Sequence, residues 1–452
     1  MKHRISELYD TYADKLVEFS KTHGPKSWII FLFIFAFIIV TTSSGWTIEP
    51  QTFPETRNIT VAHNVAGEQG AGSQGDKVNA TWAQVDNCQL DNEVRGVWLT
   101  NVDSDVLFSR ENTTEAIANL AELNFNTLYP TVWNWGYTLY PSAVAKEVTG
   151  IELDPTPGLQ NRDVLQEIID QGHQQGMAVI PWFEFGFMAP ADSTLAQLHP
   201  EWLTQRADGS TIWLEGKTHE RVRLNPLHPE VQEFITDLIV ELVNNYDVEG
   251  IQLDDHFGYP SELGYDDYTV ALYQQEHNGK SPPQNAKDPQ WIQWRADKIT
   301  DYMSELFKAI KQANPQAIVS LSPNPQGFSL KSFLLDWQTW ERKGLIEELI
   351  VQVYRNNMRS FITEITQPEI IAAKEHIPVS IGILSGLKGR NVFFSRIRQQ
   401  VDFTRERNFA GVSFFFYETL WNMATESPEA RKNHLKSLFE NSTDRVDLAC
   451  KQ

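Results

Sequence analysis

Short apolar runs recur along the chain from about residue 93 onward, and each has the length and composition of a buried strand. Between these runs lie segments with helical periodicity, and the clearest is 229–245, where apolar residues recur on one face. Helix-stop residues follow several of these segments, at Gly176, Asn314 and Gly344. The apolar runs are RGVWLTNV, FNTLYPTVW, MAVIPWFEFG, GIQLDD, AIVSLSPN, LIVQVYRN, IPVSIGIL and AGVSFFFYE.

Strands that alternate with helices over residues 91–441 are what a (β/α)8 TIM barrel, an α/β fold, requires. A doubly wound open sheet is the alternative, but it needs a topological switch point and usually has fewer repeats. The predicted barrel is large for this fold. The additional residues follow the second, third and fourth runs, in long loops rich in aromatic residues. We expect the functional residues at the C-terminal ends of the strands, which we call the barrel mouth.

An uncharged segment, residues 27–48, precedes the barrel, and the length of its strongly apolar part, 28–40, falls where membrane spans and signal-peptide cores overlap. Lysines come before this segment and none follows it closely, so residues 1–26 should stay in the cytoplasm. We predict a signal anchor that holds the barrel outside the cytoplasm, in the periplasm or at the cell surface. A cleaved signal peptide and a secreted protein are the alternative. Residues 49–90 have the composition of a linker, and 442–452 form a C-terminal tail.

The formal net charge of -21 argues against a nucleic-acid partner, because phosphate binding requires a basic surface. It suits neutral or cationic partners. The only two cysteines, Cys88 and Cys450, flank the predicted barrel. They form either one disulfide, which needs an oxidising compartment, or two unrelated thiols.

Alternation of side chains across the strand GIQLDD places Ile251 and Leu253 outward, against helices. Gln252, Asp254 and His256 then point into the barrel or its mouth. The next two strands continue this polar row with Ser320, Ser322, Asn324, Gln352 and Tyr354. The row indicates a functional mouth, although buried structural hydrogen bonds would produce the same pattern. Asp255 faces the other way and could instead cap a neighbouring backbone.

Glu184 and Glu418 follow the apolar runs PWF and FFFY, where burial of a charge is costly. The same cost raises the pKa of a carboxyl group toward the range of a general acid. The alternative is that each forms an ion pair with an arginine such as Arg95, Arg223 or Arg355.

Carboxylates surrounded by aromatic rings are typical of a carbohydrate site, and glycoside hydrolysis needs a pair of carboxyl groups and no cofactor. A metal-dependent hydrolase using Asp254, His256 and either His219 or His228 is a weaker alternative, because no HExxH spacing occurs. The candidate substrate-binding residues are Trp133, Trp135, Trp182, His256, Tyr259, Asn324, Tyr354, Tyr417 and Trp421.

The motifs EVRGVWLTNVDSDVLF, FNTLYPTVWNWGYTLYPS, VIPWFEFGFM, LNPLHPEVQEFI and GIQLDDHFGYP, in this order, resemble the glycosyl hydrolase-like 10 family. The resemblance implies a TIM barrel, an exported protein and a glycosidase, with some members acting on cell-envelope glycans such as peptide-stripped peptidoglycan strands. It maps the family's strand motif onto Asp254 and Asp255.

Together these patterns predict a membrane-anchored glycoside hydrolase of the cell envelope. We expect Asp254 to be the nucleophile, base or transition-state stabiliser, and the acid to be Glu184, Glu418 or Asp255, in that order. A non-catalytic glycan-binding protein on the same scaffold is the alternative.

Overall fold

Eight parallel strands form one sheet in the structure, a computed structural model that describes residues 92–446 except residue 217. Strands that follow one another in the chain are neighbours in this sheet, and β1 also pairs with the last strand, β15. Backbone hydrogen bonds between residues 181–183 and β9 join the two remaining ends, which closes the predicted barrel. The strands are β1 (Val94–Leu99), β2 (Thr127–Pro130), β5 (Ala178–Val179), β9 (Gly250–Asp254), β10 (Ile318–Ser322), β11 (Glu348–Gln352), β12 (Val379–Leu384) and β15 (Gly411–Phe415).

All eight apolar runs therefore contain a barrel strand, but the runs extend beyond their strands, and in two of them the reason is local. Pro181 has no N–H to donate to a neighbouring strand, so β5 is short and a separate bridge forms at Trp182. After β15, the chain leaves the sheet beyond Phe415 and turns into helix α15 (Tyr417–Trp421). The hydroxyl of Thr419 accepts a hydrogen bond from the Phe416 N–H at 3.1 Å and so stabilises the start of this helix.

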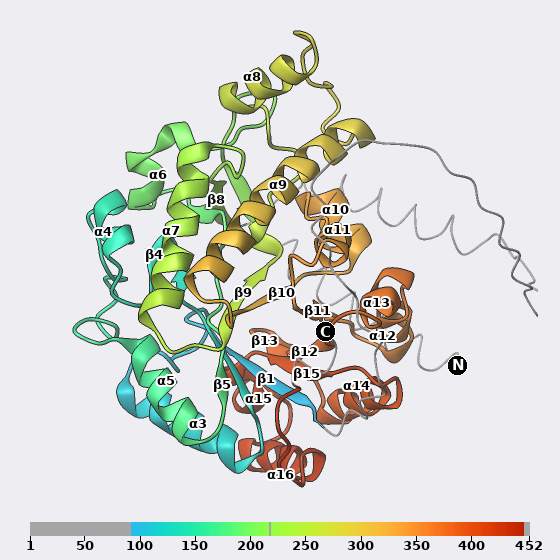
Figure 1. Ribbon diagram of the computed structural model, residues 1–452. Coiled ribbons are helices and arrows are strands. Elements are labelled where there is room, and N and C mark those ends of the chain that lie inside the picture. The colour runs from blue at the N-terminus through green and yellow to red at the C-terminus, as the bar shows by residue number, and fades with distance from the viewer. Residues whose placement is uncertain (1–91, 217, 447–452) are drawn as a thin grey trace, which may run out of the picture. The chain divides into compact units, whose positions relative to one another are not determined.

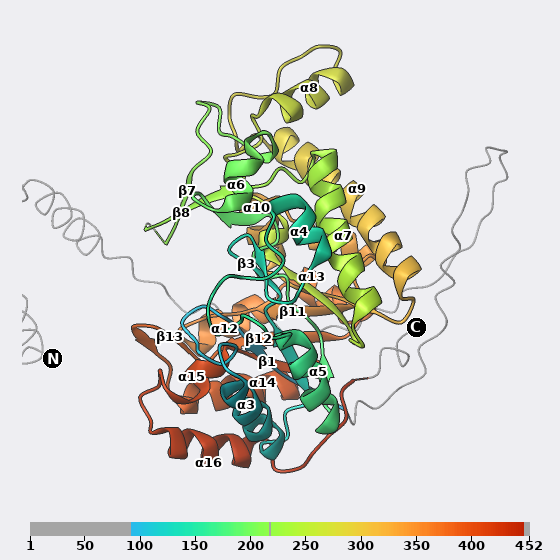
Figure 2. The ribbon, with the colours of Figure 1, turned by 90° about the vertical axis from the view of Figure 1, so that its left-hand side faces the viewer.

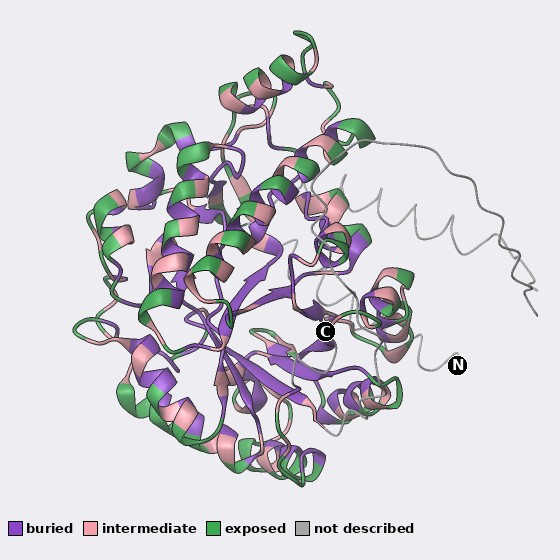
Figure 3. Cartoon of the chain, in the orientation of Figure 1, coloured by how far each residue is buried: buried purple, intermediate pink, exposed green. Residues whose placement is uncertain are grey.

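Helices surround the barrel, with their exposed faces outward and their buried faces against the strands (Figures 1 and 3). The helix predicted at 229–245 is α7, and the expected stops Gly176, Asn314 and Gly344 lie at or just beyond helix ends. The helices of this layer are α3 (Arg110–Glu122), α5 (Val164–Gln174), α7 (Pro229–Asn245), α9 (Pro289–Ala313), α11 (Trp337–Arg342), α12 (Met358–Ile365), α13 (Pro368–Ala373), α14 (Phe394–Glu406) and α16 (Pro428–Leu438).

The two faces of the strands belong to separate hydrophobic clusters. Outward residues such as Ile251 and Leu253 join the large core between strands and helices, as the alternation predicts. Inward residues form a second, smaller cluster inside the barrel, which contains Trp98, Tyr129 and Trp182. The second cluster leaves room for the polar residues of β9, β10 and β11, which also point inward.

The segments after β2, β5 and β9 are long, as expected, but they fold into elements of their own. Figure 2 shows α6, β7, β8 and α8 extending from one end of the molecule. These additional elements, with those after β10, β12 and β15, are β3 (Trp133–Asn134), β4 (Tyr137–Thr138), α4 (Ala143–Thr149), β6 (Met188–Pro190), α6 (Thr194–Leu198), η2 (Pro200–Trp202), β7 (Trp213–Glu215), β8 (His219–Arg223), η3 (Asp255–Phe257), α8 (Asp267–Glu276), α10 (Gln326–Phe333), β13 (Gly386–Leu387) and β14 (Arg390–Asn391).

Several expectations concern residues that the structure does not describe. The predicted anchor at 27–48, the linker at 49–90 and the pair Cys88 and Cys450 all lie outside residues 92–446. Among the described helices, none has both the length and the apolar character needed to cross a bilayer.

A buried ion pair closes the N-terminal end of the barrel, which we call the barrel floor. Arg445, from the segment after α16, donates to the carboxylate of Glu348, which is fully buried at the start of β11. Glu348 also accepts from Ser320, and the amide of Gln252 links Ser320 to the Trp98 indole. A chain of hydrogen bonds therefore runs from the floor toward the middle of the barrel.

Removing one member of this pair leaves an uncompensated charge in the barrel. We expect Arg445→Met to lower the free energy of unfolding by ~3–5 kcal/mol, measured by urea titration. The double variant Glu348→Gln with Arg445→Met should lose less than the sum of the two single variants. Arg110→Met, at a pair whose arginine side chain is 68% exposed, is the control. An Arg445→Met variant as stable as this control would contradict the assignment.

Candidate active site

Asp254, the last residue of β9, is held at the barrel mouth by two hydrogen bonds. Its Oδ2 accepts from the Trp182 indole at 3.1 Å, and its Oδ1 accepts from the backbone N–H of His256 at 2.8 Å. The residue is only 2% exposed, as its inward position on the strand predicts. Both partners are donors, so each oxygen of the Asp254 carboxyl group acts as an acceptor.

Glu184 lies at the same mouth, two residues beyond Trp182, and three side chains donate to its Oε2. They are Thr100 at 3.1 Å, Thr131 at 2.9 Å and Asn134 at 2.8 Å. None of these three donors was among the predicted site residues. Thr100 and Thr131 could have been found by alternation, because each lies two positions after an inward aromatic residue, Trp98 or Tyr129.

Burial and the nearby Asp254 carboxylate raise the pKa of Glu184, against the lowering effects of the Thr131 hydroxyl and His256, and the net value is about 7. The glutamate is 7% exposed. A carboxyl group with this pKa is substantially protonated near neutral pH, so it can donate a proton, while Asp254 accepts hydrogen bonds on both of its oxygens.

Asp255 faces away from this pair and binds the loop between β10 and α10. It accepts from the Asn324 backbone N–H at 2.7 Å, from the Asn324 side-chain amide, and from the Ser329 hydroxyl at 3.4 Å. Burial raises its pKa to about 6, and the charge of Asp254 adds to the shift. Asp255 therefore makes a backbone-capping contact, which was the alternative to a chemical role. Its partner in this contact is Asn324.

His256 connects the two acids. Its Nδ1 donates to the backbone carbonyl of Glu184 at 2.7 Å and lies 3.2 Å from Oδ1 of Asp254. Burial lowers the pKa of the imidazole, but the Asp254 carboxylate outweighs this effect and leaves the pKa raised. The ring therefore positions the segment that carries Glu184 and adds positive charge next to Asp254.

Aromatic rings surround the acids inside the mouth. The Trp182 ring centroid lies 6.2 Å from that of Trp98 and 6.2 Å from that of Phe415, and Tyr354 stacks on Phe415 at 5.3 Å. Trp98 and Phe415 were not predicted, although their inward positions on β1 and β15 would have identified them. Burial raises the pKa of Tyr354, as do the charges of Asp255, Asp254 and Glu184, so its hydroxyl stays protonated beside them.

Three other predicted stacking residues belong to the supporting structure. Trp133 and Tyr259 are fully buried, so the protein itself covers both faces of their rings. The Trp133 indole donates to the Gly186 carbonyl at 2.9 Å and so supports the loop that follows Glu184. Trp135 lies on the tight turn between β3 and β4 and is half-buried against the main core.

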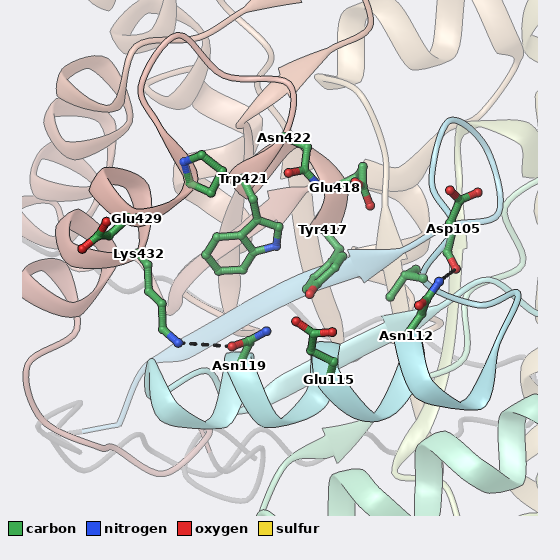
Figure 4. Close-up of a pocket in the computed structure, with 12 residues that line it drawn as sticks. Asp105, Asn112, Glu115, Asn119, Tyr417, Glu418, Trp421, Asn422, Glu429 and Lys432 are labelled. Atoms are coloured by element: carbon green, nitrogen blue, oxygen red, sulfur yellow. Dashed lines mark hydrogen bonds between the residues drawn. The ribbon is translucent and has the colours of Figure 1, made fainter.

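Tyr417, Glu418 and Trp421 do not join the acid pair. The sequence pattern placed Glu418 at the end of a strand, but it lies in the first turn of α15, where the helical backbone directs side chains differently. Its carboxylate accepts from Ser104 at 3.4 Å and from the Asn422 amide. These three residues line a pocket on the side of the barrel, between α3, α15 and α16 (Figure 4).

No arginine of the described residues forms an ion pair with Glu184 or Glu418. Arg95 pairs with Glu93 at 2.9 Å, and Arg355 pairs with Glu364 at 3.0 Å. Arg223 is fully buried and donates to the Gly258 carbonyl at 3.4 Å, while its Nε and Nη2 have no partner among the described residues.

Arg223 nevertheless contributes positive charge to the mouth. Burial lowers the pKa of its guanidinium to about 10, against the raising effects of Glu215, Asp254 and Asp255. It therefore remains a cation at neutral pH and offsets part of the negative charge of the two aspartates.

Of the histidines considered as metal ligands, His256 contacts the acid pair, whereas His219 and His228 belong to other elements. His219 begins β8, whereas His228 precedes α7 and packs on Tyr268 at 4.9 Å. Within the part of the chain that the structure describes, no group of three or more His, Cys, Asp or Glu side chains is arranged for a metal ion.

Comparison with known proteins gives one family. The model of the glycosyl hydrolase-like 10 family matches residues 93–405. The glycosyl hydrolase DigH of Escherichia coli K12 is 25% identical over 290 residues, which cover 58% of this chain and 62% of DigH. The glycosyl hydrolase YngK of Bacillus subtilis is 23% identical over 304 residues, which cover 59% of this chain and 55% of YngK. The match thus spans less than two thirds of either relative.

Among solved structures, the PgaB (BpsB) glycoside hydrolase domain of Bordetella bronchiseptica aligns with a TM-score of 0.53 at 13% identity. The alignment covers 74% of this chain and 100% of that domain. At this identity the likeness supports the barrel fold alone.

The raised pKa of Glu184 has a consequence for stability. Because the folded pKa of about 7 exceeds the ordinary value of 4.5, ionisation favours unfolding as the pH rises between these values. Relative to wild type, Glu184→Gln should therefore gain stability with rising pH, by up to ~3 kcal/mol, and level off above about pH 7. Thermal unfolding of both proteins across this pH range measures the difference. A difference that does not change with pH would show that Glu184 titrates normally.

Proposed function

The chain belongs to the glycosyl hydrolase-like 10 family, and from this premise we propose that it hydrolyses glycosidic bonds of a cell-envelope polysaccharide such as peptidoglycan strands. The observation that carries the proposal is the pairing of Asp254 with Glu184 at the barrel mouth. The surroundings of the two residues differ, since Asp254 accepts one hydrogen bond on each oxygen while the pKa of Glu184 is raised to about 7.

In this reaction Glu184 protonates the oxygen of the leaving sugar, and Asp254 acts on the anomeric carbon as nucleophile, or as base toward a water molecule. The acid must carry its proton at the start, which the buried position of Glu184 favours. Positive charge that develops on the sugar ring is stabilised by the Asp254 carboxylate. Of the three candidates for the acid, Glu184 has the strongest support. Asp255 binds Asn324, and Glu418 lines the pocket between α3, α15 and α16.

The aromatic residues of the mouth suit a sugar substrate. Tyr354 and Phe415 are only partly buried, and their stacked rings lie beside the acids. A sugar ring has an apolar face of C–H groups that packs on such rings, while its hydroxyls find partners in Gln352 and His256 at the same strand ends.

The test is digestion of purified envelope glycans, with and without peptide stems, followed by mass analysis of the products. We expect wild type to release reducing ends, and Asp254→Asn and Glu184→Gln each to lower kcat by about 100-fold or more. Glu167→Gln, which makes the same chemical change at a buried glutamate of α5 that pairs with Arg162, is the matched control and should stay active.

The pH dependence separates the two roles. Activity should fall as the pH rises above about 7, because Glu184 then loses the proton it must donate. Full activity of Asp254→Asn on a glycan that wild type cleaves would refute the proposal. Saturable binding without release of reducing ends, in wild type and variants alike, would instead identify a glycan-binding protein without catalysis.

We also propose that the barrel lies outside the cytoplasm, held by residues 27–48. The basis is the sequence of that uncharged segment, which follows two lysines. Protease treatment of intact cells, with the outer membrane permeabilised where there is one, should degrade the barrel and spare a cytoplasmic marker. Full protection of the barrel would contradict the assignment.

A further inference from the structure

A pocket of about 510 Å³ lies on the side of the barrel (Figure 4), and none of the mouth acids Asp254, Asp255 and Glu184 lines it. It is formed by residues before and within α3, residues of α15 and residues of α16. Its lining residues are Asp105, Val106, Asn112, Glu115, Asn119, Tyr417, Glu418, Trp421, Asn422, Pro428, Glu429 and Lys432. The pocket is therefore separate from the acid pair, although parts of its lining follow the C-terminal ends of β1 and β15.

Two aromatic side chains form one wall of this lateral pocket. The ring centroids of Tyr417 and Trp421 lie 5.7 Å apart with planes inclined at 70°, and Figure 4 shows both side chains on the α15 side. Trp421 is only half-buried, and its Nε1 is shielded from solvent without a hydrogen-bond partner among the described residues. The wall thus presents an accessible indole surface, whereas the indole N–H itself is covered by the protein.

Polar groups of α3 form the facing wall. Figure 4 shows Glu115 and Asn119 on this helix, across the pocket from Tyr417. Neither Glu115 nor Asp105 has a cation partner for its carboxylate within the described part of the chain, whereas Glu418 accepts from Ser104 and Asn422. Carboxylate oxygens accept hydrogen bonds and side-chain amides both donate and accept, which matches the hydroxyl groups of a sugar.

The charge of the pocket limits its ligand. Four carboxylates line it, those of Asp105, Glu115, Glu418 and Glu429, against the single cation of Lys432. The Lys432 ammonium already donates to Glu122 at 2.7 Å and to Asn119 at 3.2 Å. An anionic ligand would therefore be repelled, and a ligand without acidic groups is favoured.

We infer that the lateral pocket is a second glycan-binding site, which holds a sugar unit without an acidic group beside the Trp421 indole. A small pocket with an aromatic wall and a few polar groups is the usual form of a small-ligand site, and its size suits one or two sugar rings. The site would retain a polymer on the protein while the mouth acts on another part of it, which raises the effective concentration of substrate. The inference rests on the proposed function in one respect, namely that the ligand is a glycan.

Calorimetric titration of the full-length Asp254→Asn protein tests the inference, because this variant should bind without cleaving. The probes are neutral hexasaccharides of glucose, of mannose and of N-acetylglucosamine, and a hexamer of galacturonic acid as the acidic probe. We expect at least one neutral probe to bind at a site that Trp421→Ala weakens by about tenfold or more, whereas the acidic probe does not bind there. Trp421→Phe, which keeps a ring, should retain part of the affinity.

Trp294→Ala is the matched control, since Trp294 is a partly buried tryptophan on α9, outside the pocket. It should leave the affinity of the site unchanged. The inference is overturned if no neutral probe shows a Trp421-dependent site, or if the acidic hexamer binds as tightly as the neutral ones. Loss of hydrolysis in all proteins would refute the proposed function alone, because binding at the lateral pocket does not depend on Asp254.

Discussion

Two carboxyl groups are buried at the same end of one barrel, and surroundings of low polarity disfavour two adjacent anions. The protein responds to this constraint asymmetrically. Asp254 receives the Trp182 indole N–H and a backbone N–H, with His256 and Arg223 adding positive charge nearby. Glu184 receives three donors on a single oxygen, but burial and the charge of Asp254 still raise its pKa. The difference between the two acids follows from their surroundings and not from their residue types.

The additional segments after β2 and β5 supply much of these surroundings. Asn134, a donor to Glu184, belongs to the small β3–β4 hairpin, and Arg223 ends β8 of the three-stranded sheet that follows β5. Trp133, beside Asn134, supports the backbone just beyond Glu184 through the Gly186 carbonyl. The insertions therefore shape the mouth, while the barrel provides the strand ends on which the acids lie.

Strand positions and the inward side of β9 could be predicted from the sequence, because periodicity reports directly on burial. Alternation placed Gln252 and Asp254 inward and Ile251 and Leu253 outward, as the structure has them. Glu418 could not be placed in this way, because the strand signal of its apolar run continues past the point where β15 ends and α15 begins. The burial of Trp133 and Tyr259 also escaped prediction, since a tryptophan or tyrosine in a loop has the same sequence pattern whether it faces solvent or core.

The central claim is that Glu184 keeps its proton close to neutral pH at the barrel mouth, beside Asp254. Infrared difference spectra between wild type and Glu184→Gln, recorded against pH, observe this proton directly through the C=O band of the protonated carboxyl group. The account predicts that the band assigned to Glu184 falls to half its intensity near the pKa of about 7. A band that has already disappeared at the ordinary glutamate value, near pH 4.5, would contradict it.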